Sequence, residues 1–340
     1  MRLKHFAIAG AVCGVAALAT VAGFVAAPRA VQAGAPVHAT SGVPRYQHIF
    51  YIMMENHSYE EIVGNKNAPA INGLANQYGL ATNSWGVTHP SEPNYVAAVG
   101  GSFYGIQDDA SPYNAHQINA PYLGSQLEDA GLSWKTYQQS IPSVGYTGDY
   151  SVPAIPGQKL YAAKHNPFIN FLAYYPASQR AAELQKIVPD TQLATDLANN
   201  TVPNFSFIAP NQCYDMHGTA GCKDDAQLIK DGDAYVSATV QAIMASDAWK
   251  QGNNAIIINW DENDYSATNG VPSVASVGGH VATIVVTNHG PRGVRYDAPV
   301  NHYSVLLTIE DAFHLGCLKE SCPVAGGVQP LTPLFVASGN

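Results

Sequence analysis

Three nearly continuous apolar segments constrain the fold of this 340-residue chain more than any other feature. They are Ile49–Met54, Ala255–Trp260 and Val281–Thr287. A strand that faces water on one side alternates apolar and polar residues, whereas a strand covered on both sides is apolar throughout. We therefore expect an α/β fold with a mostly parallel central sheet and helices on both faces.

Segments with helical periodicity or helix-end signals alternate with these strands. A region rich in Gly, Pro, Tyr and Ser, residues 140–160, predicts a long loop. We expect the stretch from Gln138 to Pro167 to shape the mouth of a pocket and to influence substrate choice. The expected strands are Tyr46–Met54, Leu80–Val87, Trp134–Gln138, Asn204–Ala209, Ala255–Trp260 and Val281–Thr287, and the expected helices are Ala68–Tyr78, Pro93–Gly100, Tyr122–Ala130, Thr191–Asn199, Asp231–Ser246 and His302–Leu315.

The amino terminus has the features of a secretory signal peptide. A basic start is followed by an apolar run of small residues and by Val31-Gln32-Ala33, a small-x-small cleavage site. We predict a signal peptide over residues 1–33, a flexible leader over 34–43 and a single domain over 44–340. The protein is then secreted, either extracellular or periplasmic, without stable membrane insertion. The alternative is an uncleaved membrane anchor.

The charge of the mature chain argues against some partners. Residues 1–33 contain three basic and no acidic residues, so their removal changes the formal charge from −9 to −12. An acidic protein is a poor candidate for binding nucleic acid or an anionic membrane by bulk charge. Small phosphorylated substrates are not excluded, because local charge can capture them.

Four cysteines remain after the signal peptide, as two close pairs. In an exported protein such pairs are most simply local disulfides, and we predict Cys213–Cys222 and Cys317–Cys322. The alternative is a zinc site, with which only the spacing of the second pair is barely compatible.

Acidic and amide side chains follow two of the apolar strands. Glu55 and Asn56 follow the first strand, and Asp261 and Glu262 follow another. Open α/β sheets build their active sites at the carboxyl ends of the strands. Four oxygen-bearing side chains form the kind of shell that a hard divalent cation prefers. For Asp261-Glu262 alone, a solvated turn is the alternative.

Ser91 lies at the start of a helix whose first turn contains Pro93. It is either an ordinary N-cap or a nucleophile, because a helix amino terminus presents free N–H groups and a positive dipole to a phosphoryl group. A bound metal ion can activate its hydroxyl without a neighbouring base. Six histidines at element ends or in polar loops can hold phosphate oxygens or protonate a leaving group, unless they are ordinary hydrogen-bonded residues. These histidines are His57, His89, His165, His217, His280 and His302.

Several established motifs are absent from the sequence. The chain has no H-E-x-x-H, G-x-S-x-G or Walker sequence, and no G-x-G-x-x-G that opens a helix. These absences argue against a zinc protease, an α/β-hydrolase, a P-loop nucleotidase and a dehydrogenase.

The segments that carry these residues resemble the phosphoesterase family of bacterial acid phosphatases and phospholipases C, within the alkaline phosphatase-like superfamily. The resemblance covers residues 46–316. It rests on MMENHSYEEIVG, THPSEPNYVAAVGG, KHNPF, APNQCYDMHG, INWDEND, GGHVATIVV and NHYSVLLTIEDAFHLG.

The resemblance implies an alkaline phosphatase-like fold and roles for individual residues. It implies Ser91 as the nucleophile, with His217, His165 and His89 as further catalytic residues. The implied substrate-binding residues are Asn166, Asp215 and His280. The implied metal ligands are Glu55, Asn56, Asp261, Glu262 and Ser91.

Together these features predict a secreted, metal-dependent phosphomonoesterase of acid phosphatase type. It acts on small phosphorylated substrates through a phosphoserine intermediate, as a monomer, with one divalent cation favoured over two. One alternative is a phosphodiesterase of phospholipase C type. An alternative of another class is a non-catalytic secreted module that binds phosphorylated ligands or glycans.

Overall fold

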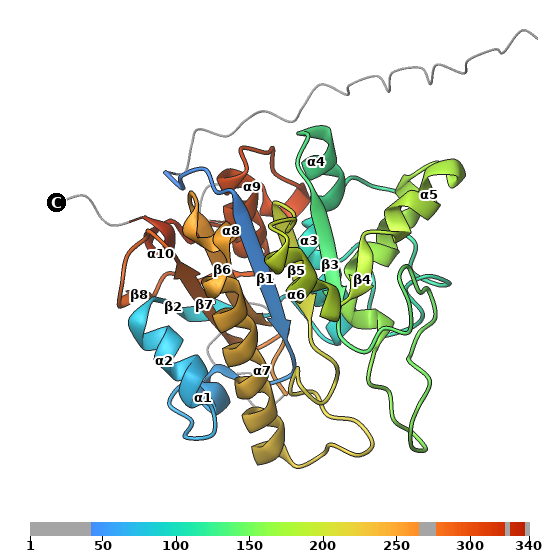
Figure 1. The fold of residues 1–340 in the computed structure, drawn as a ribbon, viewed down its shortest axis with the longest axis horizontal. Helices are drawn as coiled ribbons and strands as arrows, with labels where there is room; N and C mark the ends of the chain where they lie inside the picture. Colours follow the sequence, from blue (N-terminus) through green and yellow to red (C-terminus); the bar gives the residue numbers. More distant parts are fainter. Residues whose placement is uncertain (1–41, 265–276, 324–326, 337–340) are drawn as a thin grey trace, which may run out of the picture. The chain divides into compact units, whose positions relative to one another are not determined.

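The computed structural model describes residues 42–264, 277–323 and 327–336. The predicted signal peptide, residues 1–33, and the predicted leader up to residue 41 lie outside the described residues. Among these described residues, nine strands form one sheet in the order β4-β3-β5-β1-β6-β7-β2-β8, with β9 paired to β2 (Figure 1). The strands are β1 His48–Met54, β2 Gly79–Trp85, β3 Trp134–Gln138, β4 Ile187–Pro189, β5 Phe205–Ala209, β6 Asn254–Trp260, β7 His280–Thr287, β8 Val294–Tyr296 and β9 Val300–Asn301.

The sheet is mostly parallel, as the apolar strands predict. β1 pairs in parallel with both β5 and β6, and β3 pairs in parallel with β4 and β5. β7 runs antiparallel to both of its neighbours, β6 and β2. Its apolar run indicates burial on both faces but carries no information about direction.

Helices cover both faces of the sheet. They are α1 Tyr59–Ile62, α2 Pro69–Gln77, α3 Ser91–Gly100, α4 Leu123–Asp129, α5 Ala177–Leu184, α6 Thr191–Ala198, α7 Asp225–Ala245, α8 Asp247–Lys250, α9 His302–Ala312 and α10 Thr332–Phe335. In the described part of the chain, three 3₁₀ segments accompany them, η1 Ala163–His165, η2 Pro167–Tyr174 and η3 Lys319–Ser321.

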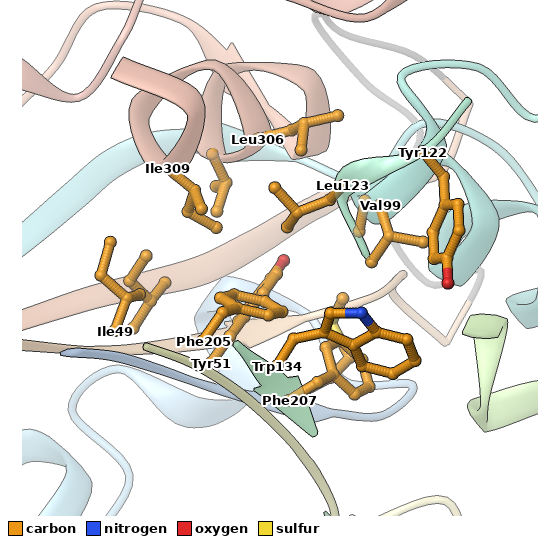
Figure 2. Close-up of a cluster of buried hydrophobic side chains, with 14 of the residues drawn as sticks. Ile49, Tyr51, Val99, Tyr122, Leu123, Trp134, Phe205, Phe207, Leu306 and Ile309 are labelled. Atoms are coloured by element: carbon orange, nitrogen blue, oxygen red, sulfur yellow. The ribbon is translucent and has the colours of Figure 1, made fainter. Parts of the chain in front are cut away.

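Strand β1 contributes side chains to two separate hydrophobic cores, because successive residues of a strand point to opposite faces. Ile49, Tyr51 and Met53 pack with residues of α3, α4, η2 and α9, and Figure 2 shows part of this core. Phe50, Ile52 and Met54 pack with residues of α2, α6, α7 and α8 on the other face. Fully burying one such side chain stabilises the fold by about 1.5–3 kcal/mol.

The boundaries of three helices differ from the sequence prediction for local reasons. α3 begins at Ser91 itself, and Pro93 is its third residue. α7 begins six residues before the predicted start, because the Asp224 side chain caps it by accepting a hydrogen bond from the Gln227 amide. α9 ends at Ala312, since His314, with φ of 58°, turns the chain before Gly316 is reached.

Both predicted disulfides are present, Cys213–Cys222 and Cys317–Cys322. The first closes a short loop between β5 and α7, the segment that also carries Asp215 and His217. The zinc alternative for the second pair is therefore wrong.

Candidate active site

The carboxyl ends of three adjacent strands bring acidic residues together. β5, β1 and β6 are parallel neighbours, so Asp215, Glu55 and Asp261 follow them at one edge of the sheet. The backbone pairing continues past the strand ends: the Glu55 amide donates to the Asp215 carbonyl at 2.8 Å, and the Asp261 amide donates to the Met54 carbonyl at 3.0 Å. All three carboxyl groups are fully buried.

Ser91 lies at the centre of this acidic group. Its hydroxyl oxygen is 3.1 Å from Glu55 Oε2 and 3.1 Å from Glu262 Oε1. Helix α3 positions it, and every residue of that helix is buried. The Asn94 side chain fixes the turn before the helix, accepting from the amides of Val87 and Thr88. Sequence reasoning missed Asn94, although it is part of the segment that resembles the family.

Asp261 and Glu262 both reach this site, so they do not form a solvated turn. Asp261 Oδ1 accepts a hydrogen bond from the Asn56 amide at 3.1 Å. Glu262 Oε2 lies 2.5 Å from His89 Nδ1, while its other oxygen faces Ser91. The chain leaves the strand after Trp260, which allows consecutive side chains to turn to the same side.

His165 lies between two carboxylates, those of Glu55 and Asp215. Its Nε2 is 3.0 Å from Glu55 Oε1, and its Nδ1 is 3.2 Å from Asp215 Oδ2. Its ring stacks on Tyr95, with centroids 5.0 Å apart. Burial opposes protonation, but Glu55 and Asp215 outweigh it and raise the pKa of His165 to about 9. His165 is therefore a buried imidazolium.

His217 and Lys164 complete the site on the side of the Cys213–Cys222 loop. His217 Nδ1 donates to the Gly218 carbonyl at 2.9 Å, and its Nε2 is 3.3 Å from Lys164 Nζ. Lys164 Nζ also donates to Ser91 Oγ at 3.1 Å and to Asp109 Oδ2 at 2.9 Å. Burial favours the neutral amine, but Glu55 and Asp109 outweigh it and raise the pKa of Lys164, which stays charged.

Sequence reasoning missed Lys164 and Asp109. Lys164 directly precedes the predicted site residue His165, and this position next to it is the sequence signal that could have identified Lys164 as a site residue. Asp109 lies in a loop segment without a recognisable pattern.

The carboxylates outnumber the positive charges that contact them. Burial would raise the pKa of Glu55, but His165 and Lys164 outweigh it and hold the pKa below its ordinary value. Burial and the charges of Glu55 and Glu262 raise the pKa of Asp261 well above its ordinary value. Burial also raises the pKa of Glu262, although His89 opposes it. Among the residues that the structure describes, the site therefore has fewer positive than negative charges.

Oxygen atoms for a cation are present at the point where Glu55, Asn56, Ser91, Asp261 and Glu262 meet. Among the described residues, Asn56 Oδ1 and Asp261 Oδ2 are buried without a hydrogen-bond partner. A buried polar atom without a partner costs about 1–3 kcal/mol. In the described ranges no three His, Cys, Asp or Glu side chains are arranged to hold a metal ion. A set of ligands at this point therefore depends on Asn56 and Ser91 as well as on the carboxylates.

The remaining candidates from the sequence occupy different places. Asn166 is fully buried and donates to the Tyr161 hydroxyl at 3.3 Å. His280 contacts Glu60 and the Thr82 carbonyl, and its ring stacks on Tyr59. The substrate-binding role of His280 stays a prediction, because none of these contacts is with Ser91 or with the carboxylates around it.

Two more histidines, His57 and His302, to which the family resemblance gave no role, have structural contacts. His57 Nε2 is 3.0 Å from Asp225 Oδ1 at the start of α7. His302 is buried against Asn259 and the Asp261 carbonyl. Burial lowers the pKa of His302 to about 4, so this histidine is neutral and helps to orient the Asp261 backbone.

A cavity of about 370 Å³ lies beside helix α3 and is lined by residues 104–108 and 115–118. It is connected to the site through His116, whose Nδ1 is 2.9 Å from Glu92 Oε1. Burial raises the pKa of Glu92 to about 7. Glu92 directly follows Ser91, so this cavity borders the site but does not contain its reactive groups.

Comparison with known proteins identifies the family. A model of the Phosphoesterase family matches residues 65–316. A phosphatidylinositol-3-phosphatase from Mycobacterium tuberculosis is 32% identical over 306 residues, which cover 90% of this chain and 88% of that protein. An acid phosphatase from Aspergillus fumigatus is 30% identical over 292 residues, which cover 83% of this chain and 58% of that protein. The chain thus spans less than two thirds of the fungal relative.

Solved structures support the fold. A protein in the alkaline phosphatase superfamily from Vibrio parahaemolyticus aligns with a TM-score of 0.51 at 11% identity, over 83% of this chain and 72% of that one. The predicted alkaline phosphatase-like fold is confirmed. The chain belongs to the Phosphoesterase family and is a hydrolase that acts on phosphoric ester bonds.

Proposed function

We propose that the protein is a secreted, metal-dependent phosphomonoesterase of acid phosphatase type, in which Ser91 forms a phosphoserine intermediate. The observation that carries this proposal is the position of Ser91 Oγ, at the first residue of a buried helix and 3.1 Å from Glu55, Glu262 and Lys164. An N-cap role does not account for these contacts, because Pro90 occupies the N-cap position.

One divalent cation fits the group formed by Glu55, Asn56, Ser91, Asp261 and Glu262. Asn56 Oδ1 and Asp261 Oδ2 are buried without a hydrogen-bond partner among the described residues, and Glu55, Asp261 and Glu262 are carboxylates with few positive charges around them there. Hard cations prefer carboxylate and amide oxygens. A bound cation would stabilise the Ser91 alkoxide and the developing charge on the phosphoryl group.

The chain's own groups then carry out two in-line displacements. Ser91 Oγ attacks phosphorus and passes its proton to one of the carboxylates 3.1 Å away, Glu55 or Glu262, while the bond between phosphorus and the leaving oxygen breaks. Water later attacks the phosphoserine and gives its proton to the group that protonated the leaving oxygen. Ser91 Oγ leaves and regains its proton as the phosphate is released. The buried His165 imidazolium offsets negative charge beneath the nucleophile.

His217 is the most suitable proton donor for the leaving oxygen. Its Nδ1 is held by the Gly218 carbonyl, which leaves Nε2 to exchange a proton on the side of Lys164, the residue that contacts Ser91. Both ring nitrogens of His165 already face carboxylates, and His89 faces Glu262.

The substrate class rests on the relatives. The two proteins compared above are named as a phosphatidylinositol-3-phosphatase and an acid phosphatase, and both names denote phosphomonoesterases. This supports a monoester substrate over a diester. Secretion is supported by the two disulfides. None of the described helices is long and apolar enough to cross a membrane.

The test is Ser91→Ala, assayed on an aryl phosphate and on phosphatidylcholine, together with metal analysis of the purified protein. We expect the wild type to prefer the aryl phosphate, and the variant to lose about 10³-fold or more of its activity while most of the metal stays bound. Full activity in a folded variant would exclude Ser91 as nucleophile. Activity on the lipid alone would favour a phospholipase C-type diesterase, and phosphate binding without hydrolysis would favour a non-catalytic module.

A further inference from the structure

Lys164 is a charged group in the site that the mechanism above leaves without a role. Its side chain is 11% exposed, and its ammonium group contacts Ser91 Oγ, Asp109 Oδ2 and His217 Nε2 at 3.1, 2.9 and 3.3 Å. An ammonium group has three donors, and two of them have oxygen partners, Ser91 Oγ and Asp109 Oδ2. Burying a charge is costly, which makes an incidental position next to the nucleophile hard to explain.

Asp109 holds this lysine in place. Its Oδ2 accepts from Lys164, and its Oδ1 accepts from the Glu92 amide at 3.0 Å. That amide belongs to the second residue of α3, immediately after the nucleophile. The Asp109 carboxylate therefore links Lys164 to the start of the helix that carries Ser91. This link fixes the position of the Lys164 ammonium group relative to Ser91 Oγ.

We propose that Lys164 is a catalytic residue that contacts a nonbridging phosphate oxygen, and that Asp109 positions it. This rests on the proposed role of Ser91 as nucleophile. When phosphorus approaches Ser91 Oγ, the nonbridging oxygens bonded to that phosphorus also come close to Oγ. They are then within reach of the Lys164 ammonium group, which is 3.1 Å from Oγ. The lysine gives up no proton and forms no bond. It stabilises the charge on the transferred group.

The same contact makes Lys164 a determinant of ester class. A phosphomonoester dianion carries one more negative charge than a phosphodiester, so its attraction to a fixed ammonium group is larger. We therefore expect loss of the lysine charge to reduce hydrolysis of monoesters more than hydrolysis of diesters. A lysine that only neutralised Asp109 and Glu55 would not distinguish the two ester classes.

The test uses Lys164→Met, Lys164→Arg and Asp109→Asn, with Lys135→Met as the matched control. Lys135 also forms an ion pair with a buried carboxylate, Asp196, at 2.6 Å, but on the β3–α6 side of the sheet. Three quantities are measured in each protein: kcat/KM on 4-nitrophenyl phosphate, kcat/KM on bis(4-nitrophenyl) phosphate, and the Kd for inorganic phosphate.

We expect Lys164→Met to lower kcat/KM for the monoester by about 10²–10³-fold and for the diester by about tenfold or less. The Kd for phosphate should rise by about tenfold or more, and Lys164→Arg should recover part of both losses. Asp109→Asn should lower monoester kcat/KM by about 10–100-fold. The control should keep its phosphate affinity whatever happens to its stability.

A second route avoids dependence on the fold of the methionine variant. All four cysteines of the described residues are in disulfides, so Lys164→Cys introduces one thiol that 2-bromoethylamine converts to a lysine analogue. Alkylation should restore monoester hydrolysis and phosphate binding.

Three results would overturn the proposal: unchanged phosphate affinity in Lys164→Met, equal losses for both esters, or no recovery after alkylation. If the wild type hydrolysed neither ester, the proposed function would fail instead, and phosphate affinity would still test the lysine.

Discussion

Asp261→Asn should stabilise the metal-free protein and weaken its response to a cation. Asp261 Oδ1 accepts from the Asn56 amide, a contact that asparagine can keep through its own Oδ1. Its Oδ2 has no hydrogen-bond partner among the described residues, and no positively charged side chain among them forms an ion pair with it. The substitution therefore removes a buried ionisable carboxyl group at almost constant volume.

The expected magnitude follows from the spacing of the carboxylates. Glu55 Oε2 and Glu262 Oε1 each lie 3.1 Å from Ser91 Oγ, so they are at most about 6 Å apart. Two unit charges at about 6 Å repel each other by about 3 kcal/mol at an effective dielectric constant of about 20. Asp261 belongs to the same group, and its raised pKa already relieves part of the repulsion by protonation. We expect a gain of about 1–3 kcal/mol at neutral pH in chelator.

The pH dependence has a definite sign. The folded protein holds the Asp261 proton more tightly than the unfolded chain, so wild-type stability falls as pH rises above the ordinary aspartate pKa of about 3.9. The advantage of Asp261→Asn should thus be absent at the acidic end and grow towards neutral pH.

The assay is urea unfolding in chelator and in excess Mg²⁺, Mn²⁺, Ca²⁺ or Zn²⁺, with the exposed Asp129→Asn as control. A cation at about 100 times its Kd stabilises the wild type by about 2.7 kcal/mol. The variant should gain much less. A variant that is less stable in chelator, or that gains as much from the cation, would refute this electrostatic account.

Two other predictions concern stability. His165→Gln leaves Glu55 and Asp215 without their shared cation and should cost about 3 kcal/mol or more below pH 6.5 in urea unfolding. Because the pKa of His165 is raised, its contribution is complete below the ordinary pKa and is lost as pH rises through about 9; a cost that does not shrink over this range would contradict the assignment. Replacing Cys213 and Cys222 by serine opens a loop with a sequence separation of nine and should cost about 2–3 kcal/mol; reductant on the wild type, which also opens Cys317–Cys322, should cost at least as much. A loss below about 0.5 kcal/mol would mean that the loop is held by other contacts.

The sequence predicts the strands well because burial leaves a clear pattern. β1, β3 and β6 were located to within about two residues, and the polar residues at the ends of β1 and β6 meet as expected. Strand direction leaves no such pattern, so β7 could not be recognised as antiparallel. The helix starts at Ser91 and Asp225 were displaced because capping depends on single side chains and backbone angles.

Contacts between distant polar residues were the least predictable part of the site. Lys164 contacts Asp109 and Ser91, which are 55 and 73 residues away in the sequence. Hydrophobic periodicity contains no information about either contact. Asn94 holds the turn before α3 by accepting hydrogen bonds from two backbone amides. Every residue except proline has such an amide, so the sequence does not show which ones Asn94 will contact. His280 belongs to a segment that resembles the family, yet its neighbours are Glu60 and Tyr59, since a motif match identifies a segment and not a contact.

The most direct test of the account is the stereochemical course at phosphorus. A phosphomonoester made chiral with oxygen isotopes is allowed to transfer its phosphoryl group to an alcohol in the presence of the wild-type protein. Two in-line displacements through Ser91 invert the configuration twice, so we predict overall retention. Inversion would mean a single direct displacement and would contradict a phosphoserine intermediate.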